Sequence, residues 1–420
     1  MAALEDRYVT IDAVRGFAVL GILLMNIVGM GLPSYAYIDP NYYGGADGVN
    51  FWTWAVNYAL VDGKMRALFT LLFGASLLLV TDRAERSGER AASVHYWRMA
   101  WLLVFGLIHG WLIWYGDILY SYALVGMVAF VFRNRSPRTL LILGGFVMLA
   151  FAAKSLLLDA PHLEALHAAA TAPDATRAAV EAWEAALGQH APPPGFERLE
   201  LEGYRGGFVE ALKARAPMTF LLEGPIFVFA FFWDVLALML VGMGLYKLGL
   251  FTGQAPTRVY LALIAFGYLV VLPLWGLMGR SLAASGFELA QIVRSDGVGA
   301  VARLFIALAH ASVVILAAKA WPRSLAIVRL AAVGRMALTN YLAASLIATT
   351  LFYGYGFGLY GQLERHQLYF VVVGIWAVQL LWSKPWLDAF LYGPFEWLWR
   401  TLARRRVQPF RRGGPQAATA

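Results

Sequence analysis

Polar side chains inside a long apolar segment near the N-terminus are the first residues whose spacing could support chemistry. Asp12 and Arg15 are three residues apart, so on a helix they meet on one face. Asn26 follows Arg15 by eleven residues, which is about three turns plus 20°, or about 16 Å along the axis. A cation and an amide would then line one groove across a membrane. Alternatively, Arg15 snorkels to the interface and Asn26 bonds a neighbouring helix.

Histidines form the second group of candidates. His109 and Asp117 fall at the facing ends of two apolar segments, among Trp and Tyr residues. A histidine there can act as a general base, but it can equally be a hydrogen-bond partner between helices. His310 is a weaker candidate of the same kind. We expect the other histidines to be solvated in loops, and they are His95, His162, His167, His190 and His366. Their spacing is not that of metal ligands, so we predict no metal site.

Other charged residues within apolar segments are also candidates, because each costs free energy in a membrane unless it is paired or hydrated. Arg335 precedes Asn340 and Tyr341, and Asp234 is a candidate partner for its guanidinium. Alternatively, Arg335 binds a phosphate of a ligand. Lys64 and Arg66 lie at the start of another apolar segment. They either mark the outer membrane–water interface or bind substrate. Arg303 completes the group.

The elements that must position these residues follow from composition. Of the 420 residues, 60% are hydrophobic and 14% charged, and mean hydropathy is +0.61. These values exclude a soluble enzyme, a disordered chain and a fibrous repeat. Cysteine is absent, which excludes disulfides and thiolate chemistry. We predict an all-α, polytopic membrane helix bundle of about ten transmembrane helices, at residues 9–32, 64–81, 97–115, 118–132, 138–158, 222–247, 259–278, 297–320, 325–352 and 368–381.

The distribution of Lys and Arg predicts the orientation. Alternate short loops are basic, whereas residues 33–61 contain neither Lys nor Arg. By the positive-inside rule, both termini are cytoplasmic and the protein lies in a cytoplasmic (inner) membrane. The net charge of +8 therefore reports orientation, and no nucleic-acid partner is expected. The basic loops and tail contain Arg83, Arg86, Arg90, Arg133, Arg135, Arg138, Lys247, Arg258, Lys319, Arg323 and Arg404 to Arg406.

The chain divides into four expected regions. Residues 1–158 form a five-helix membrane region, in which the loop 33–62 leads to an interfacial helix with Trp52 and Trp54 at headgroup level. An Ala- and Pro-rich helical insert on the outer side follows at 159–221. A second five-helix membrane region occupies 222–383, and an interfacial helix with a basic cytoplasmic tail occupies 384–420.

Five stretches of the sequence resemble the YeiB-like membrane proteins, known as domain of unknown function 418. They are DAVRGFAVLGILLMN at 12–26, GKMRALFTLLFG at 63–74, GDILYSYA at 116–123, GRMALTNY at 334–341 and GPFEWLWR at 393–400. The stretches span nearly the whole chain, and residues 159–221 resemble the family least. The resemblance implies a bacterial membrane protein.

More distantly, the first segment is similar to that of the transmembrane acyltransferases, which include the acyltransferase-3 proteins and the heparan-glucosaminide acetyltransferases. The similarity lies in Asp12-x-x-Arg15-Gly16 and in Asn26. It implies a pore in which cytosolic acyl-CoA presents its thioester to an acceptor on the outer side. Arg15 would face the phosphates or pantetheine of the donor. The glucosaminide enzymes carry a catalytic histidine soon after that asparagine, where this chain has Tyr37.

The leading hypothesis is therefore an acyl-CoA-dependent transferase acting on a sugar, a lipid, or a small alcohol or amine. His109 or Asp117 would be the base and Asn26 would stabilise the oxyanion. The candidate binding residues are Asp12, Arg15, Lys64, Arg66, Arg335, Asn340 and Tyr341. The alternatives are a transporter or flippase that uses the same groove, and a scaffold that docks a partner on 159–221. Membrane lipids are expected partners, and small residues such as Gly21 leave a homodimer open.

Overall fold

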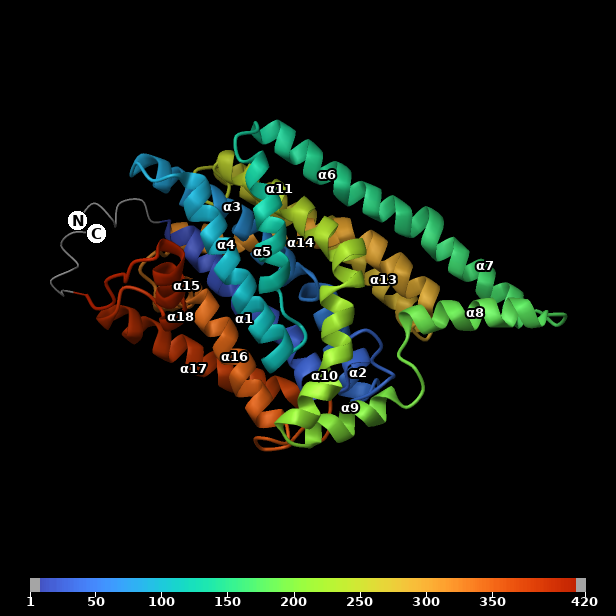
Figure 1. The fold of residues 1–420 in the computed structure, drawn as a ribbon. Helices are drawn as coiled ribbons and strands as arrows, with labels where there is room; N and C mark the ends of the chain where they lie inside the picture. Colours follow the sequence, from blue (N-terminus) through green and yellow to red (C-terminus); the bar gives the residue numbers. More distant parts are fainter. Residues whose placement is uncertain (1–7, 413–420) are drawn as a thin grey trace.

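The computed structural model describes residues 8–412, and these residues form helices joined by short connections (Figure 1). Each long helix comes from an apolar stretch that can bury or present its side chains to lipid while its backbone is hydrogen-bonded internally. The helices are α1 Val9–Gly31, α2 Gly48–Leu60, α3 Lys64–Arg86, α4 Ala91–Ile108, α5 Leu119–Ala129, α6 Pro137–Lys154, α7 Ala160–Thr171, α8 Arg177–His190, α9 Phe196–Arg205, α10 Phe208–Glu223, α11 Phe232–Lys247, α12 Thr257–Ala265, α13 Leu272–Ala284, α14 Leu289–Ala320, α15 Leu325–Arg335, α16 Ala337–Phe352, α17 Leu368–Ala389 and α18 Pro394–Arg404.

An all-α polytopic membrane protein is confirmed. Within residues 8–412, eight helices are long and apolar enough to cross a membrane, and the bent pair of α15 and α16 makes up to nine. The expected span at 118–132 corresponds to a shorter apolar helix, Leu119–Phe132. The ten predicted segments are thus all helical, although they differ in length.

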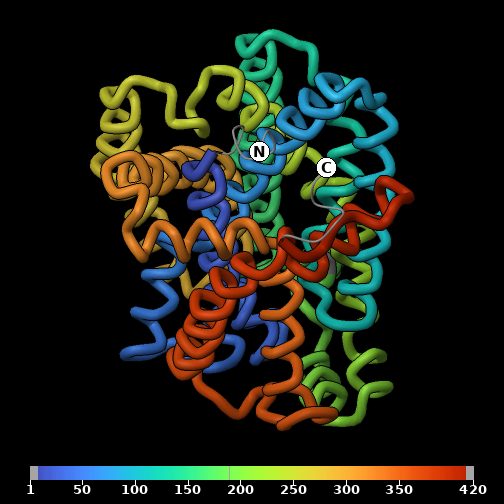
Figure 2. Tube along the Cα trace, turned by 90° about the vertical axis from the view of Figure 1, so that its left-hand side faces the viewer, coloured from blue at the N-terminus to red at the C-terminus, as the bar shows by residue number. Residues whose placement is uncertain are grey.

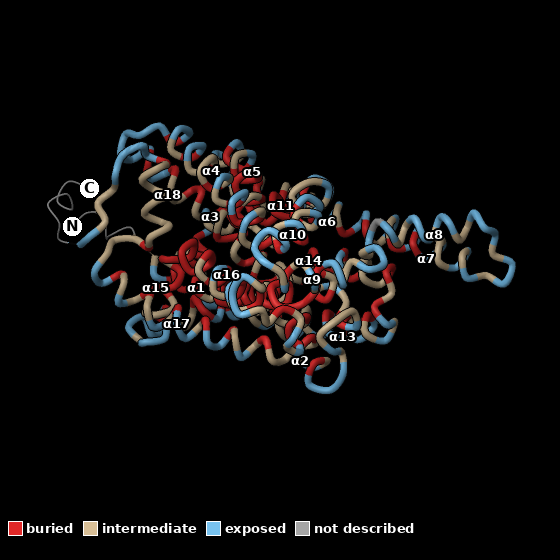
Figure 3. The backbone as a smooth tube through the Cα atoms, turned by 60° about the horizontal axis from the view of Figure 1, so that its bottom comes forward, coloured by how far each residue is buried: buried red, intermediate tan, exposed pale blue. Residues whose placement is uncertain are grey.

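α1 lies in the middle of the bundle, where nearly all of its residues are buried (Figure 3). It packs against α3, α14, α15, α16 and α17. Its backbone touches that of α15, because a Cβ on Gly16 would lie 2.0 Å from the Leu330 carbonyl oxygen. A Cβ on Gly334 would lie 1.9 Å from the Asp12 carbonyl oxygen. Small residues permit this close approach between membrane helices.

The expectation of a single helix over 325–352 is wrong. α15 and α16 meet at Met336 and are bent by 84°. α18 caps the start of α16, where backbone N–H groups lack helical partners. The Glu396 carboxylate accepts hydrogen bonds from Thr339 N at 3.0 Å and from Thr339 Oγ1 at 2.5 Å. A carboxylate at a helix N-terminus also complements the helix dipole. α18 itself lies beside α4, a distant part of the sequence (Figure 2).

The region 159–221 is continuous with the bundle at both ends. α6 runs through a π-helical turn into α7 as one 35-residue helix, and the α7–α8 hairpin projects from the molecule (Figure 1). At the other end, α10 continues into α11 within a 40-residue helical segment. The boundaries expected at 158/159 and 221/222 fall inside these helices.

One expectation for a single residue is also wrong. His95, expected in solvent, is buried on α4, and its Nε2 lies 2.9 Å from the carbonyl oxygen of Gly126. The error arises because the sequence places a residue on an element but does not specify the packing of its helix face. On α2, Trp52 is 66% exposed, whereas Trp54 is 7% exposed and packs on Tyr58 and Phe287.

Candidate active site

His109 and Asp117 form a buried pair at one end of α4. His109 begins a π-helical turn, His109–Ile113, and its Nδ1 lies 2.9 Å from Asp117 Oδ1. The other oxygen of Asp117 accepts a hydrogen bond from Tyr120 N at 2.6 Å. Both side chains of the pair are fully buried. Because the carboxylate accepts from Nδ1–H, the lone pair of the imidazole is left on Nε2.

The Nε2 atom of His109 has no hydrogen-bond partner among the described residues. Buried side-chain nitrogens are normally bonded, so an unsatisfied one needs an explanation. A carboxylate on one imidazole nitrogen and an open lone pair on the other is the arrangement of a general base with its orienting group. The pair predicted as candidate base is therefore assembled with the geometry that this role requires.

α10 clamps the turn that carries His109. Arg215 Nε donates to the carbonyl oxygen of Trp111 at 3.0 Å, and its Nη1 donates to the carbonyl oxygen of Ile113. Thr219 Oγ1, one turn further along α10, donates to Gly110 O at 3.1 Å. These carbonyls lack ordinary helical partners, since the chain leaves the helix there. Arg215 and Thr219 were missed from the sequence, because they lie in a region expected to be a separate outer insert.

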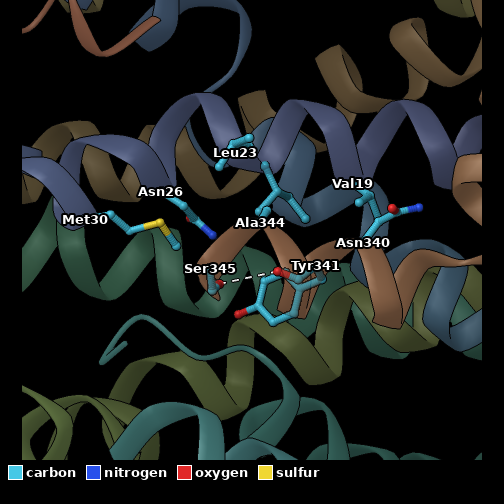
Figure 4. A pocket seen from close by; sticks show the side chains of 9 residues that line it. Val19, Leu23, Asn26, Met30, Asn340, Tyr341, Ala344 and Ser345 are labelled. Carbon is cyan, nitrogen blue, oxygen red and sulfur yellow. Dashed lines mark hydrogen bonds between the residues drawn. The ribbon is translucent and has the colours of Figure 1, made fainter. Parts of the chain in front are cut away.

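A narrow cavity lies between α1 and α16 (Figure 4). The ring of Tyr341 on α16 is 5.0 Å from the His109 ring, and its buried hydroxyl has no described partner. Tyr341 and Asn26 line the cavity from opposite helices, and the Asn26 side chain points from α1 toward α16. The space that a water molecule can occupy is about 10 Å³, and the other walls are Val19, Ile22, Leu23, Met30, Asn340, Ala344 and Ser345. Tyr341 thus lies next to both the cavity and the His109 ring, whereas His109 is not among the wall residues.

Asn340 holds the helix break in place. Its Nδ2 donates to Val333 O at 3.2 Å and to Ser383 Oγ at 3.1 Å. Its Oδ1 accepts from Trp382 Nε1 at 2.9 Å. The amide is thereby bonded to both α15 and α17, so Asn340 positions the neighbouring Tyr341.

At the other end of α1, Arg15 makes the pair that its spacing predicted. Its Nη1 lies 3.2 Å from Asp12 Oδ1, and its Nη2 donates to Ser76 Oγ at 2.8 Å. Arg15 is not among the residues that line the cavity at Asn26. Arg15 and Asn26 therefore occupy separate sections of α1.

The suggested pairing of Asp234 with Arg335 is wrong. Asp234 Oδ2 lies 2.8 Å from Arg66 Nη1, and Oδ1 lies 3.0 Å from Arg303 Nη2. The physical reason is the helix break, which makes Arg335 the last residue of α15 instead of placing it mid-span. Buried charges in a membrane protein are stable when each has a partner, and Asp234 meets this need for two cations.

Lys64 and His310 are hydrogen-bonded within the protein. Lys64 is fully buried, its Nζ donates to Tyr58 O at 2.5 Å, and it lies 4.5 Å from the centre of the Trp275 ring. It therefore joins the start of α3 to α2. His310 uses both nitrogens, with Nδ1 2.5 Å from Tyr268 Oη and Nε2 2.9 Å from Leu60 O. No group of three or more His, Asp or Glu residues within 8–412 is arranged to hold a metal ion.

Comparisons with known proteins identify relatives along the whole chain. Uncharacterized protein YeiB of Escherichia coli strain K12 is 34% identical over 417 residues, covering 96% of this chain and 98% of that protein. Uncharacterized protein YxaH of Bacillus subtilis strain 168 is 29% identical over 418 residues, covering 96% of each. No solved structure matches at a significant level. Apolar helices and bacterial relatives together indicate a bacterial multi-pass membrane protein.

Two family profiles match different parts of the chain. Residues 245–406 match the protein of unknown function DUF418. Residues 7–176 match the catalytic domain of heparan-alpha-glucosaminide N-acetyltransferase, and this range includes Asn26, His109 and Asp117. The second match points to a membrane acyltransferase-like function. The chain belongs to the YeiB-like DUF418 family, whose N-terminal region resembles that acetyltransferase domain.

Proposed function

We propose that this protein transfers an acyl group from cytosolic acyl-CoA to an acceptor on the outer side of the membrane. The observation that carries the proposal is the buried His109–Asp117 pair with its unbonded Nε2. Its imidazole ring lies 5.0 Å from that of Tyr341, which lines a cavity together with Asn26. The profile match over residues 7–176 supports the same class of reaction. In the proposed orientation, the protein lies in the inner membrane and both of its termini are in the cytoplasm.

The proposed reaction balances without a cofactor. The acceptor oxygen or nitrogen attacks the thioester carbonyl carbon as His109 Nε2 takes the acceptor proton. The negative charge that develops on the carbonyl oxygen is stabilised by hydrogen bonds from the Asn26 amide and the Tyr341 hydroxyl. The carbon–sulfur bond then breaks, and the leaving thiolate takes the proton back from the imidazolium. Asp117 holds the imidazole in the tautomer that the first step needs.

The donor is proposed to enter from the cytoplasmic end of α1. Arg15 lies at that end, about three turns from Asn26, so the phosphates of acyl-CoA and its thioester would be bound at different depths. Arg335 ends α15 beside α1 and is the second candidate for phosphate binding. A guanidinium suits this task because it binds phosphate oxygens in a bidentate manner.

The proposal is tested by release of free CoA from acetyl-CoA in nanodiscs, with an envelope extract as acceptor. The chain contains no cysteine, so a thiol reagent that detects released CoA does not react with the protein itself. His109→Gln should lower the rate by about 10²–10⁴-fold, the usual contribution of a general base. The matched control is His162→Gln, which changes an exposed histidine on α7. An unchanged rate in His109→Gln would contradict the proposal.

A transporter or flippase is the second candidate, and the break between α15 and α16 favours it. Discontinuous helices at membrane depth often form binding sites in transporters. This alternative predicts flux of a labelled lipid or small anion across proteoliposomes without release of CoA. In that case His109→Gln would change the flux while acetyl-CoA stayed intact.

A further inference from the structure

Two arginine–tryptophan stacks fasten α18 to α4. The guanidinium carbon of Arg98 on α4 lies 3.9 Å from the centre of the Trp399 ring on α18. In the reverse direction, the guanidinium carbon of Arg405, which follows α18, lies 3.8 Å from the centre of the Trp97 ring on α4. Trp399 Nε1 also donates a hydrogen bond to the backbone carbonyl of Arg98 at 2.8 Å. The side chain of Arg98 is therefore held in place against an indole ring.

The hydrogen-bond donors of the Arg98 side chain are unused. An aromatic ring stacks on the face of a guanidinium, whereas the five N–H donors lie in the plane of the group. Within residues 8–412, the Arg98 side chain forms no hydrogen bond and no ion pair. It is partly exposed, so a small solute can reach its donors. A fixed guanidinium with free donors is suited to bind an anion from outside the protein.

Other arginines add positive charge around Arg98. Its guanidinium is repelled by the charges of Arg400 and Arg404 on α18 and by that of Arg15 on α1. No carboxylate in the described part of the chain is among the groups that act most strongly on it. In a membrane protein, a charged side chain costs free energy unless it is paired or hydrated. An anion bound beside Arg98 would reduce the repulsion among these four arginines.

The position of Arg98 differs from that of the basic loop residues. The positive-inside rule accounts for Lys and Arg in short loops, but Arg98 lies two turns inside α4. It precedes His109 by eleven residues, which is about 16 Å along the helix, and Arg15 precedes Asn26 on α1 by the same number. Arg15 acts on Arg98, while Tyr341 adjoins both the His109 ring and the cavity at Asn26. The arginines of α1 and α4 thus lie at one level and the candidate reacting groups at another.

We infer that Arg98 is the centre of a binding site for a phosphate group, with Arg400 and Arg404 at its edge. A guanidinium binds two phosphate oxygens at once, and the negative charge of a phosphate suits a group of arginines. The phosphate belongs either to a soluble nucleotide or to the headgroup of an anionic lipid. For the first source the inference rests on the proposed function, since the donor acyl-CoA carries phosphates at its nucleotide end. Binding requires no acyl transfer, so it can be measured separately.

The test has two arms, both on the full chain in nanodiscs. Calorimetry in phosphatidylcholine nanodiscs measures binding of CoA and of adenosine 3′,5′-bisphosphate. In nanodiscs that also contain phosphatidic acid, native mass spectrometry counts the phosphatidic acid molecules that the released protein retains.

Arg98→Gln should weaken binding of the recognised probe by at least about tenfold, because charge-assisted hydrogen bonds to phosphate are lost. Arg98→Lys keeps the charge without the planar guanidinium and should weaken binding less. The control is Arg258→Gln, which removes an exposed arginine at the start of α12 and should leave binding unchanged.

The outcomes separate the two sources, and they separate the inference from the proposed function. Loss of affinity for a soluble probe in Arg98→Gln identifies a nucleotide phosphate, whereas loss of retained phosphatidic acid identifies a lipid headgroup, and either result supports the inference. Equal binding of every probe by Arg98→Gln and the wild type, or no binding of any probe, overturns it even if CoA release is normal. Binding of CoA that depends on Arg98, without CoA release, supports the inference and contradicts the acyltransferase. If Arg98→Gln does not fold, Arg404→Gln at the exposed edge is the second test, and unchanged binding there overturns the inference.

Discussion

The guanidinium of Arg215 on α10 donates from Nε to the backbone carbonyl of Trp111, two residues beyond His109, at 3.0 Å. A second donation reaches the carbonyl of Ile113. Arg215 is fully buried. The side chain therefore connects α10 to the turn that holds the candidate base.

Replacing Arg215 by Met should destabilise the protein, since two buried carbonyl groups would lose their donors. We expect a loss of about 2–6 kcal/mol, from about 1–3 kcal/mol for each of the two unsatisfied groups. Thermal unfolding in nanodiscs measures the change. Arg198→Met is the control, because Arg198 pairs with Glu202 on an exposed helix face and should change stability by less than about 0.5 kcal/mol. Equal effects of the two substitutions would show that Arg215 does not brace the turn.

Asp117→Asn should reduce CoA release while leaving the fold intact. An asparagine amide keeps the size of the carboxylate but can donate to His109 Nδ1, which moves the imidazole proton to Nε2 and removes the base. We expect a decrease of about 10²–10⁴-fold at neutral pH, as for orienting carboxylates in other hydrolytic and transfer sites. Asp388→Asn, in an exposed pair with Lys384, should leave the rate unchanged. A rate within twofold of the wild type would rule out an orienting role for Asp117.

Gly16→Ala and Gly334→Ala should separate α1 from α15. Each added methyl group would meet a backbone carbonyl oxygen of the other helix, at 2.0 Å and 1.9 Å, and backbone cannot move aside as a side chain can. Overpacking of this kind costs about 1–3 kcal/mol. Gly145→Ala on α6 is the matched control, since its methyl group meets nothing within 4 Å. The measurement is the midpoint temperature of thermal unfolding of each variant. An unchanged midpoint in Gly16→Ala would show that α1 and α15 can move apart without loss of stability.

Stability should fall as the pH rises from about 4.5 to about 7 because of Glu200. Burial raises the pKa of this carboxyl to about 7, while hydrogen bonds from Ser34 oppose the shift. The folded state therefore keeps a proton that the unfolded state releases near pH 4.5. The stability that this proton contributes is complete below pH 4.5 and is lost as the pH rises through the pKa of the folded state. The free energy of unfolding, measured from pH 4 to 8, should depend less steeply on pH in Glu200→Gln than in the wild type. Glu202→Gln, on the exposed side of α9, should show the same pH dependence of the free energy of unfolding as the wild type.

Much of the fold could be predicted from the sequence because span length and hydropathy are local properties. The ten apolar segments and the Asp12–Arg15 pair are examples, since helical spacing alone brings those two side chains together. The break at Met336 could not be predicted this way, because Glu396 and Asn340 stabilise it through contacts with α18 and α17. The local sequence there is as apolar as in an unbroken helix.

The candidate site shows the same limit. His109 and Asp117 could be selected as chemically unusual residues in apolar surroundings, and the structure pairs them. The partners of Asp234 depended on which of several distant cations packed against it, and the choice of Arg335 was incorrect. Arg215 had no sequence signal beyond its basic character, since its role arises from the packing of α10 against the turn that carries His109.

The cap that Glu396 places on Thr339 has a consequence for how the protein is made. The helices that carry His109, Asp117 and Arg215 all emerge from the ribosome before residue 224, whereas the capping helix α18 emerges more than 170 residues later. Proteins generally acquire structure from the N-terminus during synthesis. An unfinished chain therefore contains the His109–Asp117 pair but not the Glu396 cap at the start of α16, and the candidate site is completed only when translation of the C-terminal helix is finished.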